Sequence, residues 1–244
     1  MIAARRFFVE GAVEAGAVVE IGGGDARKIV RVLRLREGDC IEVIDSTAAV
    51  FSAAIAETGR VVRAKLVERV AEGERAGAVR IDVAQAVPKG QRMEFVVEKG
   101  TELGAAAFLP FFCERSVARR LGEEKLARWR RLARTAAQQC GRRDVPEVLA
   151  PCGFEDLAER FSGYDAVLFA WELAEARSLR EALATALRGA QRILVVVGPE
   201  GGFTHEEAEA AQQRGATMLS LGPRILRTDT AALALLAVIG ALAS

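Results

Sequence analysis

The sequence predicts an α/β protein in which a mainly parallel sheet follows a smaller β-rich module. From residue 79 onward, apolar runs such as "RILVVV" alternate with helical stretches. These runs lack polar alternation, which is typical of strands buried on both faces of a parallel sheet. The first 70 residues instead carry short strand-like segments separated by "EGD" and "TGR" turns. A third observation is that two apolar runs lead directly into glycine-containing loops, "GPEGG" after Val197 and "GPRILRT" after Leu221.

The first module is expected to be a small barrel. Its one helix is predicted from Asp25 to Leu33, with Asp25 as the N-cap and apolar side chains on one face. The charged, small-residue stretch 68–78 is interpreted as the boundary, which gives domains 1–72 and 73–244. The strands of this module are predicted at residues 7–9, 40–44, 50–55 and 61–67.

The second domain is expected to alternate strands and helices. Because ligands bind at the carboxyl ends of parallel strands, its two glycine loops mark the candidate site. Thr204 and Glu207 have capping-box spacing after the first loop. The strands are predicted at 81–87, 107–112, 166–171, 193–197 and 217–221, and the helices at 92–103, 122–140, 179–187, 204–214 and 228–242.

Composition excludes several classes of protein. The 244 residues are 51% hydrophobic and 27% charged with a net charge of +1, which is ordinary for a globular chain. With one histidine and no CxxC pair, a metal site is not expected, and the four cysteines are expected to be reduced and mostly buried. No signal peptide is recognisable, and the apolar run 231–243 is shorter than the ~20 residues that span a bilayer. The sequence therefore predicts a cytoplasmic protein without a membrane segment.

The glycine loop "GPEGGFTHEE" leaves two readings open. Its glycines would let a ligand approach the backbone, yet it lacks a Walker lysine and GxGxxG spacing, so it could equally be a plain strand-to-helix turn. His205 is expected to be a solvated residue of the first helical turn. Arginines cluster at residues 115–143 and again at 5–36, which fits either phosphate binding or a solvated face.

Seven stretches, in order along nearly the whole chain, resemble the ribosomal RNA small-subunit methyltransferase E family of the SPOUT superfamily. Each stretch is weakly diagnostic alone, and the ordered set is specific. They are "RFFV" at 6–9, "VLRLREGD" at 32–39, "KGQRMEFVVEKGTELG" at 89–104, "ERSV" at 114–117, "QCGRRDVPEV" at 139–148, "VGPEGGFTHEE" at 197–207 and "LGPRILRTDTA" at 221–231.

The resemblance implies a PUA-like N-terminal barrel and a C-terminal domain that ends in a trefoil knot. It further implies that S-adenosylmethionine binds in the knot, that the enzyme is a homodimer, and that it methylates N3 of a specific uridine in 16S ribosomal RNA of the small subunit. Two rival readings stay open: a SPOUT enzyme with another RNA target, and a non-catalytic RNA-binding assembly factor. Family members often have histidine where Arg27-Lys28 stands here and glutamate where Gln138 stands.

Candidate site residues follow from the resemblance together with the chemistry of methyl transfer, and a structural tie to loop or helix carbonyls stays open for Arg227. Arg227 and Glu200 are the candidates for catalysis, through stabilisation of a uracil anion or removal of the N3 proton. The expected cofactor contacts are Phe169, Ala170, Gly198, Pro199, Glu200, Gly201, Gly202, Leu221, Gly222, Ile225 and Leu226. The expected RNA contacts are Arg6, Arg31, Arg34, Lys89, Arg92, Lys99, Arg115 and Arg142.

The C-terminal helix is expected to take part in the dimer. Its apolar side chains cover more than one helical face, so one sheet is not expected to bury them all. These side chains are those of Leu233, Leu235, Leu236, Val238, Ile239 and Leu242. Glutamate in place of Leu236 or Ile239 is expected to lower solubility or to yield monomers with weak cofactor binding, because a charge would be buried unpaired.

Overall fold

The computed structural model describes residues 5–71, 79–174 and 179–243. The chain forms two compact units, one of residues 1–76 and 137–144, the other of the remainder. The predicted boundary falls largely within 72–78, outside the described residues, although the strand before it continues to Ala71. Segment 137–144, which the predicted boundary places in the second domain, joins the first unit. Gln138 Nε2 reaches both carboxylate oxygens of Asp25 at 3.1 Å, and the guanidinium of Arg6 donates to the carbonyl of Gly141.

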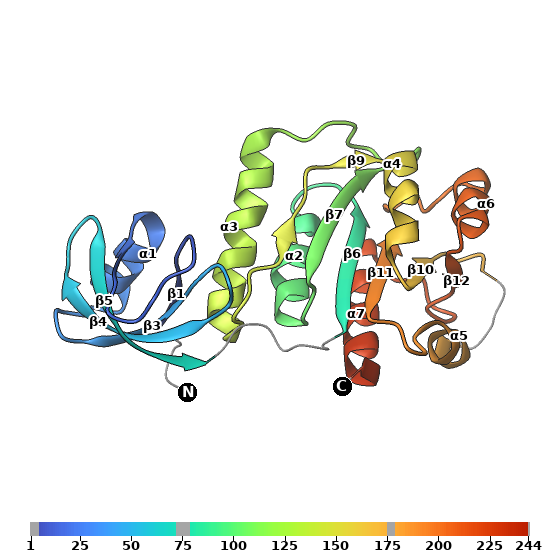
Figure 1. The fold of residues 1–244 in the computed structure, drawn as a ribbon. Coiled ribbons are helices and arrows are strands. Elements are labelled where there is room, and N and C mark those ends of the chain that lie inside the picture. Colours follow the sequence, from blue (N-terminus) through green and yellow to red (C-terminus); the bar gives the residue numbers. More distant parts are fainter. Residues whose placement is uncertain (1–4, 72–78, 175–178, 244) are drawn as a thin grey trace. The chain divides into compact units, whose positions relative to one another are not determined.

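The first unit is built on a five-stranded sheet (Figure 1). Four of its strands match the predicted ones, and the short strand β2, "VVEI", was not predicted. The pairing of β1 with β3 is parallel and the other pairings are antiparallel. In sheet order the strands are β1 (Arg6–Phe8), β3 (Cys40–Ile44), β4 (Val50–Glu57), β5 (Val62–Ala71) and β2 (Val18–Ile21).

The predicted helix 25–33 is replaced by two short pieces, α1 (Gly23–Arg27) and a π-helical turn (Lys28–Val32). Asp25 is not the N-cap, because the glycine run lets the helix start earlier, at Gly23 with φ of +61°. Arg34, just beyond the π-helical turn, has φ of +53°, a conformation that is uncommon for residues other than glycine. The helical segment is therefore irregular at its end.

The second unit contains a seven-stranded sheet in which every pairing between described strands is parallel, as predicted. The five predicted strands are present, and the two-residue strands β8 and β9 were too short to predict. The main order is β12 (Thr217–Leu219), β10 (Ala166–Ala170), β11 (Arg192–Val197), β6 (Arg80–Ala86), β7 (Ala107–Phe112) and β8 (Glu147–Val148), and β9 (Cys152–Gly153) also pairs with β7.

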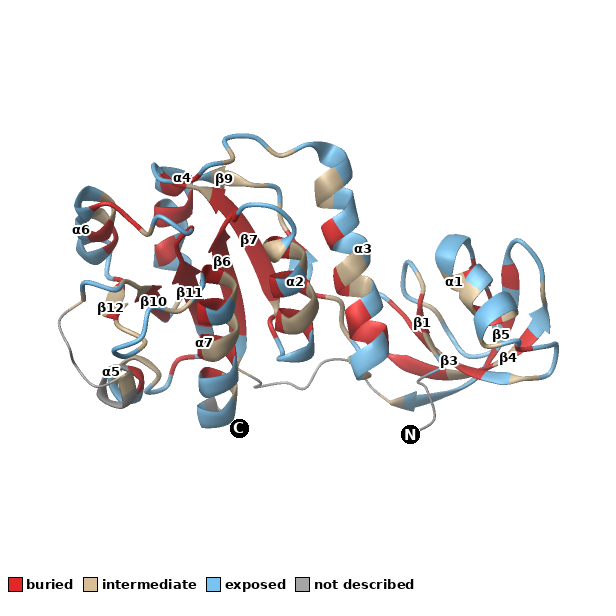
Figure 2. Cartoon of the chain, turned by 180° about the vertical axis from the view of Figure 1, so that it is seen from behind, coloured by how far each residue is buried: buried red, intermediate tan, exposed pale blue. Residues whose placement is uncertain are grey.

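Helices cover both faces of this sheet, so its strands are buried on both sides (Figure 2). One apolar core includes Trp129 and Leu235 and lies under α2, α3, α5 and α7, and the other includes Phe154 and Ala211 and lies under α4 and α6. Helix α4 was not predicted. The helices are α2 (Arg92–Glu102), α3 (Glu123–Cys140), α4 (Phe154–Glu159), α5 (Leu179–Ala186), α6 (His205–Gln213) and α7 (Thr228–Ala243).

Helix α7 is only partly buried within the second unit. Leu236 and Ile239 are fully buried within the single chain and belong to its core. The close approach of α2 explains this: a Cβ on Gly100 would lie 2.8 Å from the Phe108 ring and 3.4 Å from Leu236. Val238 and Leu242 remain 38% and 61% exposed. Within the part of the chain that the structure describes, no helix has the length and apolarity needed to cross a membrane.

The cysteine prediction is correct in part. All four thiols are free. Cys113 is buried, and desolvation raises the pKa of its thiol. Cys40 and Cys140 are exposed because they lie at the ends of β3 and α3, so the expectation that the thiols are mostly buried was wrong for these two.

Candidate functional site

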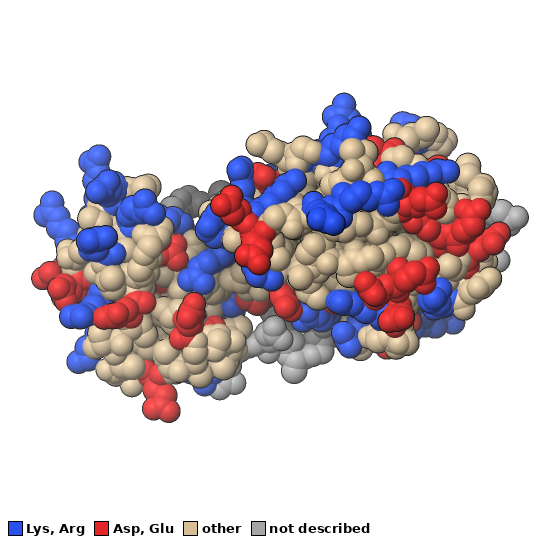
Figure 3. Space-filling model, turned by 90° about the horizontal axis from the view of Figure 1, so that it is seen from above, with Lys and Arg blue, Asp and Glu red and all other residues tan. Residues whose placement is uncertain are grey.

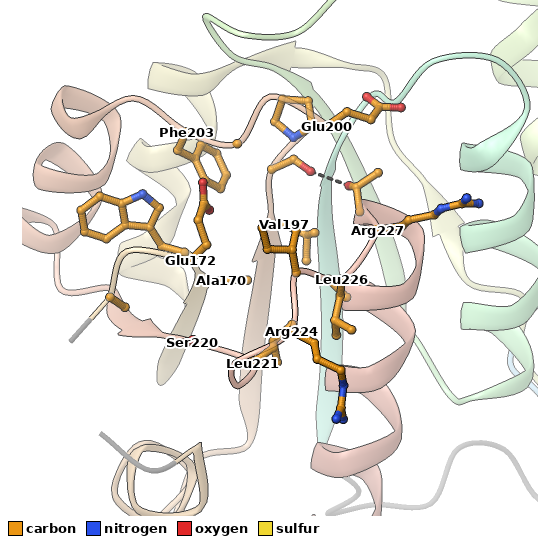
Figure 4. A pocket seen from close by; sticks show the side chains of 18 of the residues that line it. Ala170, Glu172, Val197, Glu200, Phe203, Ser220, Leu221, Arg224, Leu226 and Arg227 are labelled. Carbon is orange, nitrogen blue, oxygen red and sulfur yellow. Dashed lines mark hydrogen bonds between the residues drawn. The ribbon is translucent and has the colours of Figure 1, made fainter. Parts of the chain in front are cut away.

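A pocket of about 980 Å³ lies in the second unit beside the carboxyl ends of three neighbouring strands (Figure 4). Its walls are residues 170–172 after β10, residues 197–203 after β11, and residues 220–228 between β12 and α7. The strand-end rule and the two glycine loops therefore located the pocket correctly. The volume is at the upper end of the about 300–1,000 Å³ that is usual for small-molecule sites.

Most of the predicted cofactor residues line this pocket. Ile225 is among them, but it is 92% exposed. It therefore lies at the rim of the pocket and does not enclose a ligand. The lining residues from the predicted set are Ala170, Gly198, Pro199, Glu200, Gly201, Gly202, Leu221, Gly222, Ile225 and Leu226, together with Arg227.

Phe169 is the exception, because it does not line the pocket. Its ring is fully buried and lies 4.2 Å from the ring of Phe203, centroid to centroid. Successive side chains of a strand point to opposite faces, so Ala170 faces the pocket while Phe169 packs in the opposite core. Sequence reasoning missed the pocket-lining residues Ser220, Arg224 and Thr228, which lie beside or within the second glycine loop, and Glu172, which follows β10.

Glycine is required by the geometry of both loops. Gly202 has φ of +67°, and a Cβ there would lie 2.7 Å from Glu172 Oε1. Gly222 has φ of +102°, a conformation that side chains disfavour, and a Cβ there would meet no atom within 4 Å. Both positions therefore favour glycine through their left-handed backbone conformation, because the Glu172 carboxylate beside Gly202 is the end of an exposed, flexible side chain. The capping box of Thr204 and Glu207 is present as predicted, and His205 is the exposed first residue of α6.

The two residues expected to act in catalysis differ in their surroundings. Glu200 Oε1 accepts hydrogen bonds from Arg92 at 2.6 Å and from the backbone N–H of Lys89 at 3.1 Å. The second carboxylate oxygen, Oε2, accepts none from the described residues. The guanidinium of Arg227 likewise has no carboxylate partner within the described part of the chain, and it extends in a different direction from that of Arg224 (Figure 4).

Several predicted RNA contacts of the second unit have partners inside the protein. Arg115 donates to the carbonyl oxygens of Gly201 and Phe203, both at 3.0 Å, and so supports the glycine loop. Lys99 forms ion pairs with Glu102 and Glu98, and hydrogen bonds to these carboxylates raise the pKa of its ammonium group. These residues have structural roles that sequence reasoning had not assigned.

The same is true of Arg6 and Arg142 in the first unit. Arg6 pairs with Glu42, and Arg142 pairs with Asp144. Their side chains are only 25% and 16% exposed, so neither is a readily accessible cation. Sequence position placed them in basic clusters but could not show these partners.

The first unit has a basic hollow of its own, about 800 Å³ in volume, which we call the arginine groove. It is formed where α1 and the π-helical turn meet the turn between β4 and β5. Arg31 and Arg60 have no hydrogen bond or ion pair to the described residues, and Arg27 donates only to the carbonyl of Gly23, at 3.4 Å. Figure 3 shows Lys and Arg side chains gathered on one part of this unit. The groove is lined by Gly23, Arg27, Val30, Arg31, Thr58, Gly59, Arg60 and Val61.

The pocket has the chemistry of a site for a flat, partly apolar organic ligand. Val197, Leu221 and Leu226 provide apolar walls, and the backbone of two loops provides hydrogen-bonding groups. Trp171 also lines the pocket, and its Nε1–H is buried without a hydrogen-bond partner among the described residues. No group of three or more histidine, cysteine or carboxylate side chains that could hold a metal occurs in the ranges described.

Known proteins share this sequence and fold. A model of the RNA methyltransferase domain matches residues 75–240. Proteins named ribosomal RNA small subunit methyltransferase E are 32% identical in Bacillus subtilis, over 96% of this chain and 95% of that protein, and 34% identical in Mycobacterium bovis, over 98% and 92%.

Solved structures agree with the sequence comparisons. The methyltransferase E of Neisseria gonorrhoeae, bound to S-adenosylmethionine, is 28% identical over 98% of both chains, with a TM-score of 0.82. A methyltransferase of Legionella pneumophila in complex with the same cofactor is 28% identical over 99% of this chain and 98% of that one, with a TM-score of 0.87. The chain therefore belongs to the ribosomal RNA small subunit methyltransferase E family.

Proposed function

We propose that this protein binds S-adenosylmethionine in the pocket of the second unit and methylates N3 of a specific uridine in 16S ribosomal RNA. The observation that carries the proposal is the pocket between three strand-end loops. Two of these loops contain a glycine with positive φ, Gly202 in one and Gly222 in the other. The relatives named above for the small-subunit ribosomal RNA, and the similar structures with bound S-adenosylmethionine, support the same cofactor and substrate.

The pocket residues fit this cofactor. Leu221 and Leu226 would enclose the adenine ring, and backbone groups of the loop 220–227 would bind its polar edge. Trp171 would form part of the wall that follows β10. When bound, the cofactor supplies an activated sulfonium methyl group.

The protein's own task is to prepare the uridine. N3 of uracil carries a proton that must leave before its electron pair can form the new N–C bond. In this proposal Oε2 of Glu200 accepts the N3 proton. The other oxygen, Oε1, already accepts hydrogen bonds from Arg92 and from the backbone N–H of Lys89. Arg227 would lie beside the uracil oxygens and stabilise the negative charge that develops there.

The finer features of the fold are also proposals. The chain leaves the edge strand β12 and then packs α7 against β6, β11 and α2, with Thr228 bonded to the carbonyl of Gly198 in the other loop. Such a return past an earlier loop supports a trefoil knot, a rare connection in proteins. The curled five-stranded sheet of the first unit supports a PUA-like barrel over residues 1–72.

Cofactor binding can be tested with the unchanged protein and two glycine variants. By titration calorimetry we expect Gly222→Val to bind S-adenosylmethionine at least tenfold more weakly, about 1.4 kcal/mol, because valine cannot easily hold the loop conformation. Gly104→Val is the matched control, since Gly104 has φ of +92°, is exposed and lies outside the pocket. Equal affinity of the two variants would contradict the placement of the cofactor at Gly222.

We further propose that the arginine groove binds the phosphate backbone of the RNA. Guanidinium groups without internal partners are available for bidentate phosphate contacts. Arg34 and Lys89 are also exposed and are kept as RNA contacts, while Arg6, Lys99, Arg115 and Arg142 have the internal partners described above.

Charge reversal in the groove should weaken RNA binding specifically. We expect Arg31→Glu or Arg60→Glu to lower the affinity for small-subunit ribosomal RNA about tenfold and to reduce the salt dependence by about one phosphate contact. Arg69→Glu, an equal charge change at an exposed position outside the groove, should have less effect. Filter-binding titrations at several salt concentrations measure this, and equal losses in all three variants would reject the groove as a phosphate site.

The homodimer is proposed from the exposed side of α7. Val238→Glu with Leu242→Glu should convert a dimer into monomers, measured by analytical ultracentrifugation, because both apolar side chains are exposed in the single chain. The melting temperature of the monomer fold should change little for the same reason. Val67→Glu, an exposed apolar position of the first unit, is the control. An unchanged dimer in the double variant would exclude this face of α7.

A further inference from the structure

A buried polar cluster lies where three segments of the second unit meet. Gln85, near the end of β6, is completely buried. Its Nε2 lies 2.7 Å from Thr228 Oγ1, 3.0 Å from the carbonyl oxygen of Ala86, and 3.5 Å from the carbonyl oxygen of Gly198. Thr228, the first residue of α7, is 6% exposed, and its hydroxyl donates to the same carbonyl of Gly198.

The direction of these hydrogen bonds follows from the number of protons. The Thr228 hydroxyl has one proton, and the carbonyl of Gly198 can only accept, so that proton is used there. Thr228 Oγ1 must therefore accept from Gln85, and the amide must present Nε2 rather than Oε1. The carbonyl of Ala86 requires the same orientation. The cluster thus has one consistent arrangement.

This arrangement leaves one atom unsatisfied. Gln85 Oε1 is buried and has no hydrogen-bond partner among the described residues. An acceptor in that state is unfavourable for folding, and an apolar side chain would fill the same strand position without this penalty. What glutamine offers in return is the pair of hydrogen bonds that its amide donates to Thr228 and to the carbonyl of Ala86.

What the cluster does is join both pocket loops to the sheet. Gly198 is the first residue of the glycine loop, and Thr228 closes the loop 220–227. Phe203 packs on the other side of Gly198, where a Cβ would lie 2.9 Å from its ring. The start of the glycine loop is thus held between Phe203 on one side and Thr228 with Gln85 on the other.

We propose that Gln85 and Thr228 are positioning residues that fix the two loops in their binding geometry before the cofactor enters. A pocket whose loops are already ordered loses less conformational entropy on binding, so the tie strengthens cofactor affinity without touching the reacting atoms. This inference rests on the proposed function, because it assumes that the pocket binds S-adenosylmethionine.

The test compares hydroxyl removal at two buried threonines. Thr228→Val should bind S-adenosylmethionine at least tenfold more weakly by calorimetry, and Thr228→Ser, which keeps the hydroxyl, should restore affinity to within about threefold of the unchanged protein. Thr101→Val is the matched control, because the Thr101 hydroxyl is buried in α2 and donates to the carbonyl of Val97. It should lower the melting temperature but leave cofactor affinity intact. Thr228→Ala replaces the valine variant if that one does not fold.

A double-mutant cycle tests whether the two residues act together. Gln85→Leu alone should also weaken binding, and the double variant with Thr228→Val should lose less affinity than the two single losses combined. Two results would contradict the proposal. One is that the Thr228→Val and Thr101→Val variants bind S-adenosylmethionine with equal affinity. The other is that the losses of binding free energy in Gln85→Leu and Thr228→Val add in the double variant, which would mean that the two residues do not act together.

Hydrogen exchange of the unchanged protein gives an answer that depends on no variant. Without cofactor, the amide of Gly202, which donates to the carbonyl of Pro199, should be protected because the loop is already held. Exchange at the rate of an unstructured peptide would overturn the inference. An unchanged protein that does not bind S-adenosylmethionine at all would instead reject the proposed function, so the two failures are distinguishable.

Discussion

Replacing Leu236 with glutamate should abolish folding of the second unit. The side chain is fully buried close to Gly100 of α2, in a cluster of apolar residues that includes Phe108. An unpaired carboxylate at such a position is among the most destabilising single changes, beyond the about 2–5 kcal/mol that a Leu→Ala change removes. Soluble yield and thermal unfolding measure the effect.

Leu242→Glu on the same helix is the control for that variant. Leu242 is 61% exposed, so the single chain should stay folded with glutamate there. If Leu236→Glu instead gave a folded monomer, Leu236 would be an interface residue after all. The assignment of its helical face to the core would then be wrong.

Removing the guanidinium of Arg227 should lower kcat for methyl transfer by about a hundredfold, the usual size of a lost electrostatic contact to a developing anion. Arg227→Ala should leave S-adenosylmethionine affinity within about threefold, because the side chain extends from the rim and the apolar walls remain. Single-turnover kinetics with small-subunit particles separate the two effects.

The controls for Arg227 are a conservative change and a distant arginine. Arg227→Lys should recover part of the rate, since it restores charge without the planar fork. Arg214→Ala should be silent, because Arg214 pairs with Glu155 away from the pocket. A loss of cofactor affinity with unchanged kcat in Arg227→Ala would reassign Arg227 to binding.

Local pattern was enough to predict most of the second unit. Strands such as Ile193–Val197 are recognisable because a run buried on both faces is apolar throughout, and the glycine loops follow them directly. Because such a strand is apolar throughout, its sequence does not show toward which face of the sheet each side chain points. In β10 every position is apolar, so Phe169 and Ala170 could not be separated by pattern, and only the pocket showed that Ala170 faces it.

Partners far apart in sequence were beyond prediction. Arg92 and Glu200 are 108 positions apart, and Gln85 and Thr228 are 143 apart. Pairing in both cases depends on which strands become neighbours in the sheet, because β6 lies beside β11 only after a long crossover. For the same reason a cluster of arginines in the sequence did not reveal that the exposed Arg115 would donate hydrogen bonds to carbonyl oxygens of the glycine loop.

Mapping the methyl group is the most direct test of the proposed activity. Purified protein, S-adenosylmethionine with a labelled methyl group, and small ribosomal subunits from a strain lacking the enzyme would be incubated, and the 16S RNA digested and sequenced by mass spectrometry. The account predicts one labelled nucleotide, a uridine methylated at N3, which is lost with Arg227→Ala. Label on a ribose, on another base, or on transfer RNA would contradict it, and so would the absence of transfer by a protein that binds the cofactor.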